Sequence, residues 1–281
     1  MSAVLILVTG AGGTLARHVV RALTERGARV RAGSRTPAAV KGLPDGTEVV
    51  PLDLAGPHTF APALEGVDKV FLYCEPRGIE AFTAAARDAG VSHLTVLSSA
   101  SVIDGRPPAN PIAAHHARVE EVVAASGLPC TFVRVGSLAT SALNWAAQVR
   151  TGVVRGPYAR SEAAPAHEAD VAAVAAAALT GSGHTGRRYV VTGPESLTQR
   201  RQAEIVGAAV GRSVRYEEVP PDAAREALLA AMPPEFADTV LSYLAAGVDR
   251  PAPVEDTVLR VTGAPARTFA QWAAEHSADF R

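Results

Sequence analysis

One segment near the N-terminus constrains the fold more than any other. The apolar, β-type run Val4–Thr9 leads directly into Thr9-Gly10-Ala11-Gly12-Gly13-Thr14-Leu15-Ala16. Gly10 permits a tight turn, Gly13 lets the backbone approach a pyrophosphate, and the small Ala16 lets a following helix pack against the strand. The helix N-terminus supplies N–H donors and a positive dipole end. We therefore predict a dinucleotide-binding turn, with an ordinary βα turn as the alternative. Its predicted cofactor contacts are Thr9, Gly10, Gly12, Gly13, Thr14 and Leu15.

The rest of the chain alternates short β-branched runs with longer segments of helical period, a pattern typical of a parallel sheet covered by helices on both faces. The expected strands are 4–9, 29–34, 48–51, 70–74, 93–98, 130–135 and 188–192. Helices are expected between the first two strands, at 78–90 and at 110–127; a helix at 197–211, a strand at 214–219 and helices from 222 follow. We predict an α/β fold with a Rossmann-type, doubly wound parallel sheet in residues 1–194. Residues 195–281 are expected to form a small C-terminal α/β cap that binds substrate.

The end of the second strand indicates which dinucleotide is bound. An NAD site favours an acidic residue there, which accepts hydrogen bonds from the ribose, whereas an NADP site favours arginine for the 2′-phosphate. No acidic residue occurs between Arg26 and Pro44, and Ser34-Arg35 stands at the strand end with Lys41 shortly after it. We predict NADP(H), with Arg35 as the main phosphate contact and Ser34 or Lys41 in support; alternatively, Arg35 is a solvated loop residue.

The sequence resembles the NmrA-like group of atypical short-chain dehydrogenases/reductases, which includes NADPH-dependent quinone reductases and redox-sensing regulators. The resemblance spans nearly the whole chain. It is carried by Val8-Thr9-Gly10-Ala11-Gly12-Gly13 and by the segments 30–35, 66–72, 91–99, 119–121, 126–134, 170–172, 192–194 and 268–270. It implies the fold and the cofactor more specifically than the reaction, because the group contains reductases, isomerases and non-catalytic sensors.

The usual proton-transfer pair of short-chain dehydrogenases is missing. That pair is Tyr-x-x-x-Lys, but this chain has only two lysines, Lys41 and Lys69, and neither follows a tyrosine by four positions. Alignment on Glu120 places Ile112 at the tyrosine position and His116 at the lysine position. His116 is the catalytic candidate, as a proton donor or as a group that holds a ribose hydroxyl. The alternative is that the histidine faces solvent at the entrance of a helix.

Further candidates follow from the resemblance and from the expected strand order. Ser98 and Ser99 end the fifth strand, where the family's substrate-orienting hydroxyl lies; we assign Ser98 to the cofactor and Ser99 to the substrate, with strand-end caps as the alternative. The remaining cofactor candidates are Asp53 and Leu54 beside the adenine, Tyr73 beside the nicotinamide ribose, and Gly136; the alternatives are a turn or N-cap role for Asp53 and a core role for Tyr73. The remaining substrate candidates are Ser137, Trp145 and Tyr158, with core packing as the alternative for the two aromatic residues.

The composition of the chain excludes some classes of binding partner. A formal net charge of −1 argues against a nucleic-acid surface, and no apolar run approaches the length of a membrane span. No cluster has metal-ligand spacing. We expect a cytoplasmic protein with a small-molecule substrate, no metal, and no membrane or nucleic-acid partner. A homodimer is compatible with the sequence.

The reaction predicted from these features is NADPH-dependent reduction of a quinone-like or other conjugated carbonyl compound. Such an electron-poor acceptor takes hydride with only a weak acid or water as the proton donor. The missing Tyr-Lys pair therefore restricts the class of substrate but does not exclude hydride transfer. Two alternatives remain: a non-catalytic NADP(H)-sensing regulator, and a natural-product isomerase, cyclase or epimerase.

Overall fold

A parallel sheet of seven strands forms the centre of the molecule in the computed structural model, which describes residues 4–281. Its order is β11-β6-β5-β4-β1-β2-β3. The strands are β1 Leu5–Thr9, β2 Arg29–Ser34, β3 Glu48–Pro51, β4 Lys69–Leu72, β5 His93–Ser99, β6 Cys130–Val135 and β11 Arg188–Val191. The chain builds outward from β1 in one direction and then from β4 in the other, so the strand order reverses between β1 and β4. In such sheets ligands bind at the carboxyl ends of the strands beside this reversal.

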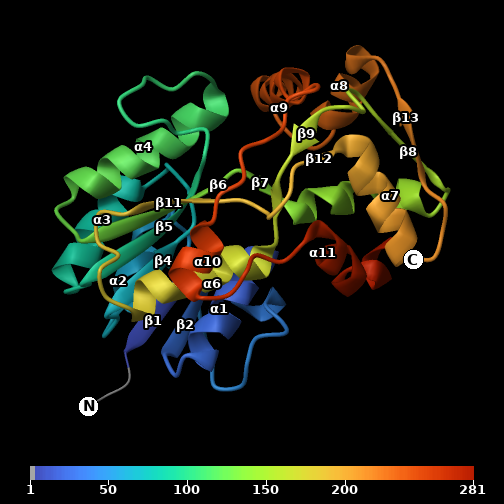
Figure 1. Cartoon of the computed structure of the whole chain (residues 1–281). Helices are drawn as coiled ribbons and strands as arrows, with labels where there is room; N and C mark the ends of the chain where they lie inside the picture. Colours follow the sequence, from blue (N-terminus) through green and yellow to red (C-terminus); the bar gives the residue numbers. More distant parts are fainter. Residues whose placement is uncertain (1–3) are drawn as a thin grey trace.

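Helices cover both faces of the sheet (Figure 1). On one face lie α1 Thr14–Glu25, α6 Glu168–Thr180 and α10 Thr257–Thr262, and on the other α2 Phe60–Leu64, α3 Ile79–Asp88 and α4 Pro111–Ala125. The apolar positions Val19, Val20 and Leu23 of α1 are fully buried against the sheet, at the spacing that the sequence shows. The predicted α/β Rossmann-type fold is confirmed.

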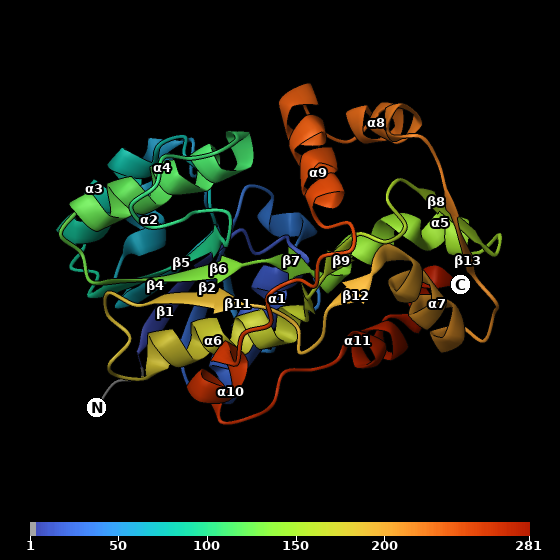
Figure 2. The same cartoon turned by 45° about the horizontal axis from the view of Figure 1, so that its top comes forward.

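A third apolar cluster lies beside the sheet and draws on two separate stretches of sequence, 139–159 and 197–280. Trp272 is fully buried in it and stacks on Phe269, with ring centroids 5.2 Å apart. The helices that contribute to it are α5 Ala146–Val149, α7 Gln199–Ala209 and α11 Phe269–Glu275. Two further helices of this part of the chain, α8 Pro221–Leu229 and α9 Pro234–Ala246, lie outside the cluster. Figure 2 shows this part beside the carboxyl side of the sheet, with α8 and α9 at its margin.

Short elements complete the chain. Three two-stranded pairs are β7 Ser137–Leu138 with β10 Pro165–Ala166, β9 Glu162–Ala163 with β12 Leu197–Thr198, and β8 Val153–Gly156 with β13 Arg215–Glu218. The 3₁₀ helices are η1 Pro37–Ala39, η2 Pro57–Thr59, η3 Ala139–Trp145 and η4 Ser277–Phe280. Because β8 precedes residue 194 and pairs with β13 beyond it, the small cap also uses a segment from the middle of the chain.

Several predicted boundaries differ from the structure by one or two residues, and two of these differences matter here. The fourth strand ends at Leu72 instead of Cys74, so Tyr73 already lies beyond the sheet. The helix predicted from Leu197 begins at Gln199, because Leu197–Thr198 pairs with β9 and the Thr198 side chain then accepts a hydrogen bond from the Arg201 N–H as the helix N-cap.

Candidate functional site

The glycine-rich turn lies at the carboxyl end of β1, beside the reversal of strand order. Gly10 has φ +71°, in the left-handed region that glycine adopts without strain. A Cβ added there would meet the Tyr73 Cβ at 3.3 Å, so Gly10 and Tyr73 pack closely across the reversal. The Gly13 N–H donates to the Gly10 carbonyl at 2.9 Å and closes the turn.

The start of α1 fits a bound phosphate group. Its N-cap is Gly13, which has no side chain to accept from the first N–H groups, a feature that it shares with the Gly78 N-cap of α3. The first N–H groups of a helix have no partner within it and, with the helix dipole, favour an anion. The turn and the uncapped helix together suit a dinucleotide pyrophosphate.

The end of β2 lies against the same turn. The Ala11 N–H donates to the Gly33 carbonyl at 3.0 Å, and a Cβ at Gly12 would be 3.9 Å from the Ser34 Oγ. Ser34 is buried and its Oγ accepts from the Thr36 N–H at 3.2 Å. Arg35 is exposed, and within residues 4–281 it forms no ion pair.

The other adenine-side candidates lie near this strand end. Lys41 is exposed in the segment after η1. Asp53 takes the turn role that was its alternative, since its Oδ1 accepts from the Ala55 N–H at 3.0 Å. Leu54 packs on the core beneath α2 and α3, and its carbonyl lies only 2.1 Å from the position of a Cβ at Gly78.

Three candidates stand at the ends of β4 and β6. Tyr73 is 50% exposed, and its N–H donates to the Thr9 Oγ1 at 2.8 Å, which ties it to the end of β1. Gly136 is exposed and donates its N–H to the Val191 carbonyl at 3.2 Å. The Ser137 Oγ is buried and has no hydrogen-bond partner among the described residues. A free hydroxyl here is available to a ligand.

The Ser98 side chain is hydrogen-bonded within the protein. Ser98 is buried, and its Oγ donates to Glu120 Oε1 at 2.6 Å, on the face of the sheet that α4 covers. Its hydroxyl therefore belongs to a buried ion-pair network. Ser99 points the other way along the alternating strand and lies half-buried at its end, with its Oγ 2.8 Å from the Ser101 Oγ.

His116 lies on α4, one turn before Glu120, and is half-buried. Burial, with a smaller contribution from the neighbouring His115, lowers the pKa of His116 to about 4, although Glu120 opposes the shift. The ring is consequently neutral near pH 7 and holds no proton to give as an imidazolium. Its Nδ1 is buried without a partner among residues 4–281. His116 can thus hydrogen-bond a ligand, but the prediction that it donates a proton from the charged form is not supported.

Of the two aromatic substrate candidates, Trp145 makes a core contact. Its ring packs edge-to-face on Tyr216, with centroids 6.2 Å apart, in the third apolar cluster. Tyr158 is half-buried and has φ +53° in a turn where its carbonyl accepts from the Ser161 N–H at 2.8 Å. A core packing role for Trp145 and a turn position for Tyr158 account for both residues.

Contacts that the sequence did not predict bring α9 onto the start of α4. Asn110 caps α4 through its Oδ1 and donates through its Nδ2 to the Tyr243 hydroxyl at 2.7 Å. One turn along, His115 packs edge-to-face on Phe236, and its Nε2 lies 3.4 Å from the Cys74 carbonyl. The cap thereby reaches the carboxyl ends of β4 and β5. Local sequence carries no signal for contacts between residues 133 positions apart.

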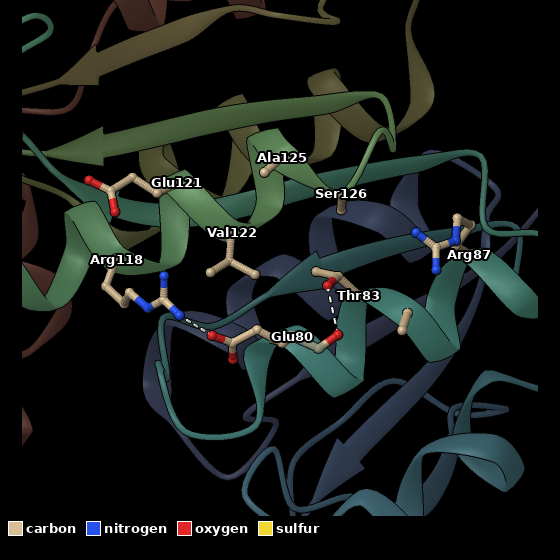
Figure 3. A pocket seen from close by; sticks show the side chains of 9 residues that line it. Glu80, Thr83, Arg87, Arg118, Glu121, Val122, Ala125 and Ser126 are labelled. Carbon is tan, nitrogen blue, oxygen red and sulfur yellow. Dashed lines mark hydrogen bonds and ion pairs between the residues drawn. The ribbon is translucent and has the colours of Figure 1, made fainter.

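A separate hollow lies between α3 and α4 (Figure 3). It has a volume of about 460 Å³ and includes Glu80, Arg87, Arg118 and Glu121, with Arg118 paired to Glu80. It lies on the outer side of these helices, away from the turn at Gly10, so it is not part of the candidate site.

Among residues 4–281 no group of three or more His, Cys, Asp or Glu side chains has an arrangement that could hold a metal ion. No helix in the same part of the chain is both long enough and apolar enough to cross a bilayer.

Together, the strand order, the glycine turn and the uncapped α1 define a dinucleotide-binding Rossmann protein. Residues 2–249 match the NmrA-like family, and the chain belongs to that family. It is 42% identical to the (4-alkanoyl-5-oxo-2,5-dihydrofuran-3-yl)methyl phosphate reductase of Streptomyces griseus, over 98% of this chain and 99% of the relative. It is 36% identical to the NAD(P)H azoreductase of Xenophilus azovorans, over 98% and 99% of the two chains.

Solved structures agree with the fold. The NADPH-dependent quinone oxidoreductase of Escherichia coli, in complex with NADPH, superposes with a TM-score of 0.80 at 26% identity and covers 96% of this chain and 99% of its own. The Citrobacter triphenylmethane reductase in complex with NADP(H) gives a TM-score of 0.79 at 22% identity, over 97% and 99% of the chains, and supports the fold alone. The predicted family is confirmed, as is the prediction of an enzyme of the NAD(P)H-dependent reductase type.

Proposed function

We propose that the protein is an NADPH-dependent reductase of a conjugated carbonyl compound. One observation carries the proposal: the glycine turn and the uncapped start of α1 lie against the end of β2, where Arg35 is exposed and no acidic residue is present. This arrangement suits the 2′-phosphate of NADPH and offers no carboxylate to accept from the ribose hydroxyls of NADH. Relatives named as NAD(P)H-dependent reductases support the same conclusion.

The substrate class follows from the chemistry of the most informative relative. The compound in the name of the Streptomyces griseus enzyme has a ring double bond conjugated to both a lactone and an alkanoyl carbonyl. Such a double bond is electron-poor and accepts hydride at the carbon remote from the carbonyls. We extend this class to the present chain, whose own sequence predicts a conjugated acceptor because the Tyr-Lys pair is missing.

The residues of the chain have mainly positioning roles in this proposal. The pyrophosphate is held by Gly10, Gly13 and the start of α1. Tyr73 packs against Gly10, beside the point where the strand order reverses. When bound, the cofactor supplies hydride. The free Ser137 hydroxyl and the neutral His116 ring are placed to hydrogen-bond the carboxamide, ribose or substrate carbonyl. Since His116 is neutral near pH 7, we assign the proton that completes the reduction to water or another weak acid and not to an imidazolium.

The test is a titration with NADPH and NADH, followed by acceptors in the same sample. We expect tighter binding of NADPH, and oxidation of NADPH with an alkanoyl butenolide phosphate, other enones or quinones. Binding without turnover across this panel would instead favour an NADP(H)-sensing protein. Tighter binding of NADH would contradict the role of Arg35.

A further inference from the structure

The chain around the proposed cofactor site is strongly basic. Between Thr9 and Pro44 the only acidic residue is Glu25, whereas seven residues are basic: Arg17, Arg21, Arg26, Arg29, Arg31, Arg35 and Lys41. A 2′-phosphate carries close to two negative charges near neutral pH, so more than one cation is expected around it. The structure shows which of the seven can reach it.

Three of these arginines are directed elsewhere. Arg31 pairs with Glu48 and also donates to the carbonyls of Ala63 and Glu65. Arg29 stands at the opposite, amino end of β2, and Arg26, beyond the C-terminal end of α1, donates to Thr180 Oγ1 at 3.4 Å. Arg17, Arg21, Arg35 and Lys41 remain.

Arg17 lies on the first turns of α1 and points back toward the glycine turn. Its Nη2 donates to the Thr14 Oγ1 at 3.3 Å, as expected for a helix side chain that leans toward the N-terminus. Arg17 is exposed, and within the described part of the chain it forms no ion pair. Its guanidinium is therefore held at the phosphate-binding end of the helix without an acidic partner.

The side of α1 that carries Arg17 faces the connection after β2. Arg21, four residues on and thus on the same side of the helix, lines a hollow of about 420 Å³ with Gly42, Leu43 and Pro44. Arg17 lies one turn closer to the turn at Gly12, which itself packs against Ser34 at the end of β2. Arg17 thus lies near the start of α1 and Arg35 just after the end of β2, the two elements that the glycine turn brings together.

We propose that Arg17 is a second cation for the 2′-phosphate of NADPH, opposite Arg35. The inference rests on the proposed cofactor but not on turnover. A guanidinium from α1 and another from β2 would hold the phosphate from two sides, while the helix N–H groups hold the pyrophosphate. Arg17 is accordingly a specificity-determining residue, and Arg21, one turn further from the site, is its natural control.

The experiment measures the dissociation constants of NADPH, NADH and adenosine 2′,5′-bisphosphate for the full-length protein and for Arg17→Gln and Arg21→Gln. We expect Arg17→Gln to weaken the binding of NADPH and of the bisphosphate about tenfold or more, which is the usual effect of losing a charge-assisted hydrogen bond. The dissociation constant of NADH should be unchanged. Arg21→Gln should leave all three unchanged.

Two results would overturn the proposal. If Arg17→Gln weakened the binding of NADPH and of NADH equally, Arg17 would contact the pyrophosphate and not the 2′-phosphate. If the variant bound both cofactors as tightly as the wild type, the Arg17 side chain would be solvated. Failure of the proposed function appears separately, because wild-type protein that binds NADPH without reducing any acceptor would contradict the reductase and still support Arg17. Unfolding of each variant in urea shows whether an altered affinity reflects lost folding.

Discussion

Arg134 donates from Nε and Nη2 to the two carboxylate oxygens of Glu120, at 2.9 and 2.7 Å, and both side chains are at most 7% exposed. Ser98 adds a third bond to the same carboxylate, and Asp104 accepts from Arg134 at 2.8 Å. The network joins α4 to β5 and β6. Because His116 lies one turn before Glu120, the network also sets the position of the His116 ring at the edge of the sheet.

Removal of one partner of this pair should destabilise the protein strongly. Glu120→Ala leaves the buried Arg134 guanidinium without its main acceptor, and such a loss typically lowers the free energy of unfolding by about 3–5 kcal/mol. Glu204→Ala, which breaks the exposed Arg201–Glu204 pair, is the control and should change it by about 1 kcal/mol or less. Urea denaturation of both variants checks this; similar losses would contradict the structural importance of the buried pair.

Alanine substitutions at two glycines with nearly the same φ angle should distinguish loss of stability from loss of cofactor binding. Gly10 and Gly27 have φ +71° and +78°, so alanine at either position should cost about 1 kcal/mol of stability. Only at Gly10 does the added Cβ meet another residue, Tyr73, beside the proposed cofactor. We expect Gly10→Ala to abolish measurable NADPH binding and Gly27→Ala to retain it, by fluorescence titration. Equal retention would place the cofactor elsewhere.

The parts of the molecule that the sequence predicted best depend on short-range patterns. The strands 29–34, 48–51 and 130–135 were predicted to the residue, since each is a β-type run set off by turn residues. The glycine turn and its proximity to Ser34 likewise follow from a single βαβ unit. Such units have one common handedness and packing, so a local motif is enough to place its parts.

The side-chain contacts that the sequence did not predict depend on partners far along the chain. Ser98 was assigned to the cofactor because nothing nearby shows that Glu120 would take its hydroxyl. Trp145 was assigned to substrate, but its partner Tyr216 lies on β13. Alternation along a strand gives two faces, but which buried polar group each face meets is decided by tertiary packing.

Arg35 should determine the choice of cofactor. Arg35→Gln removes the exposed guanidinium at the end of β2, so NADPH should bind about tenfold more weakly or worse while NADH binding stays nearly constant. Arg29→Gln, at the other end of the same strand, is the matched control and should change neither. Isothermal titration calorimetry measures all the constants. An unaltered preference for NADPH in Arg35→Gln would show that another group selects the cofactor.

Stability should fall in mild acid because two histidines are buried as neutral rings. Burial lowers the pKa of both His93 and His116 to about 4, with Lys69 and His184 contributing at His93 and His115 at His116. Between pH 6.5 and 4 the unfolded chain binds protons that the folded protein does not, so the free energy of unfolding decreases as the pH falls. Each ring adds at most about 1.4 kcal/mol per pH unit to that slope.

The variant His93→Gln tests how much His93 contributes to the fall of the free energy of unfolding with pH. His93→Gln keeps a polar group near Thr131 Oγ1, which lies 3.0 Å from the His93 Nε2, but removes the titrating ring. We expect a shallower fall in stability between pH 6.5 and 4.5, measured by urea denaturation at several pH values. His58→Gln removes an exposed ring and should leave the slope unaltered. If His93→Gln and the wild type lost stability in parallel as the pH fell, His93 would have to be charged in the folded protein. Its buried position between β4 and β6 would then require an anionic partner, and among residues 4–281 no carboxylate lies within ion-pair distance of its ring.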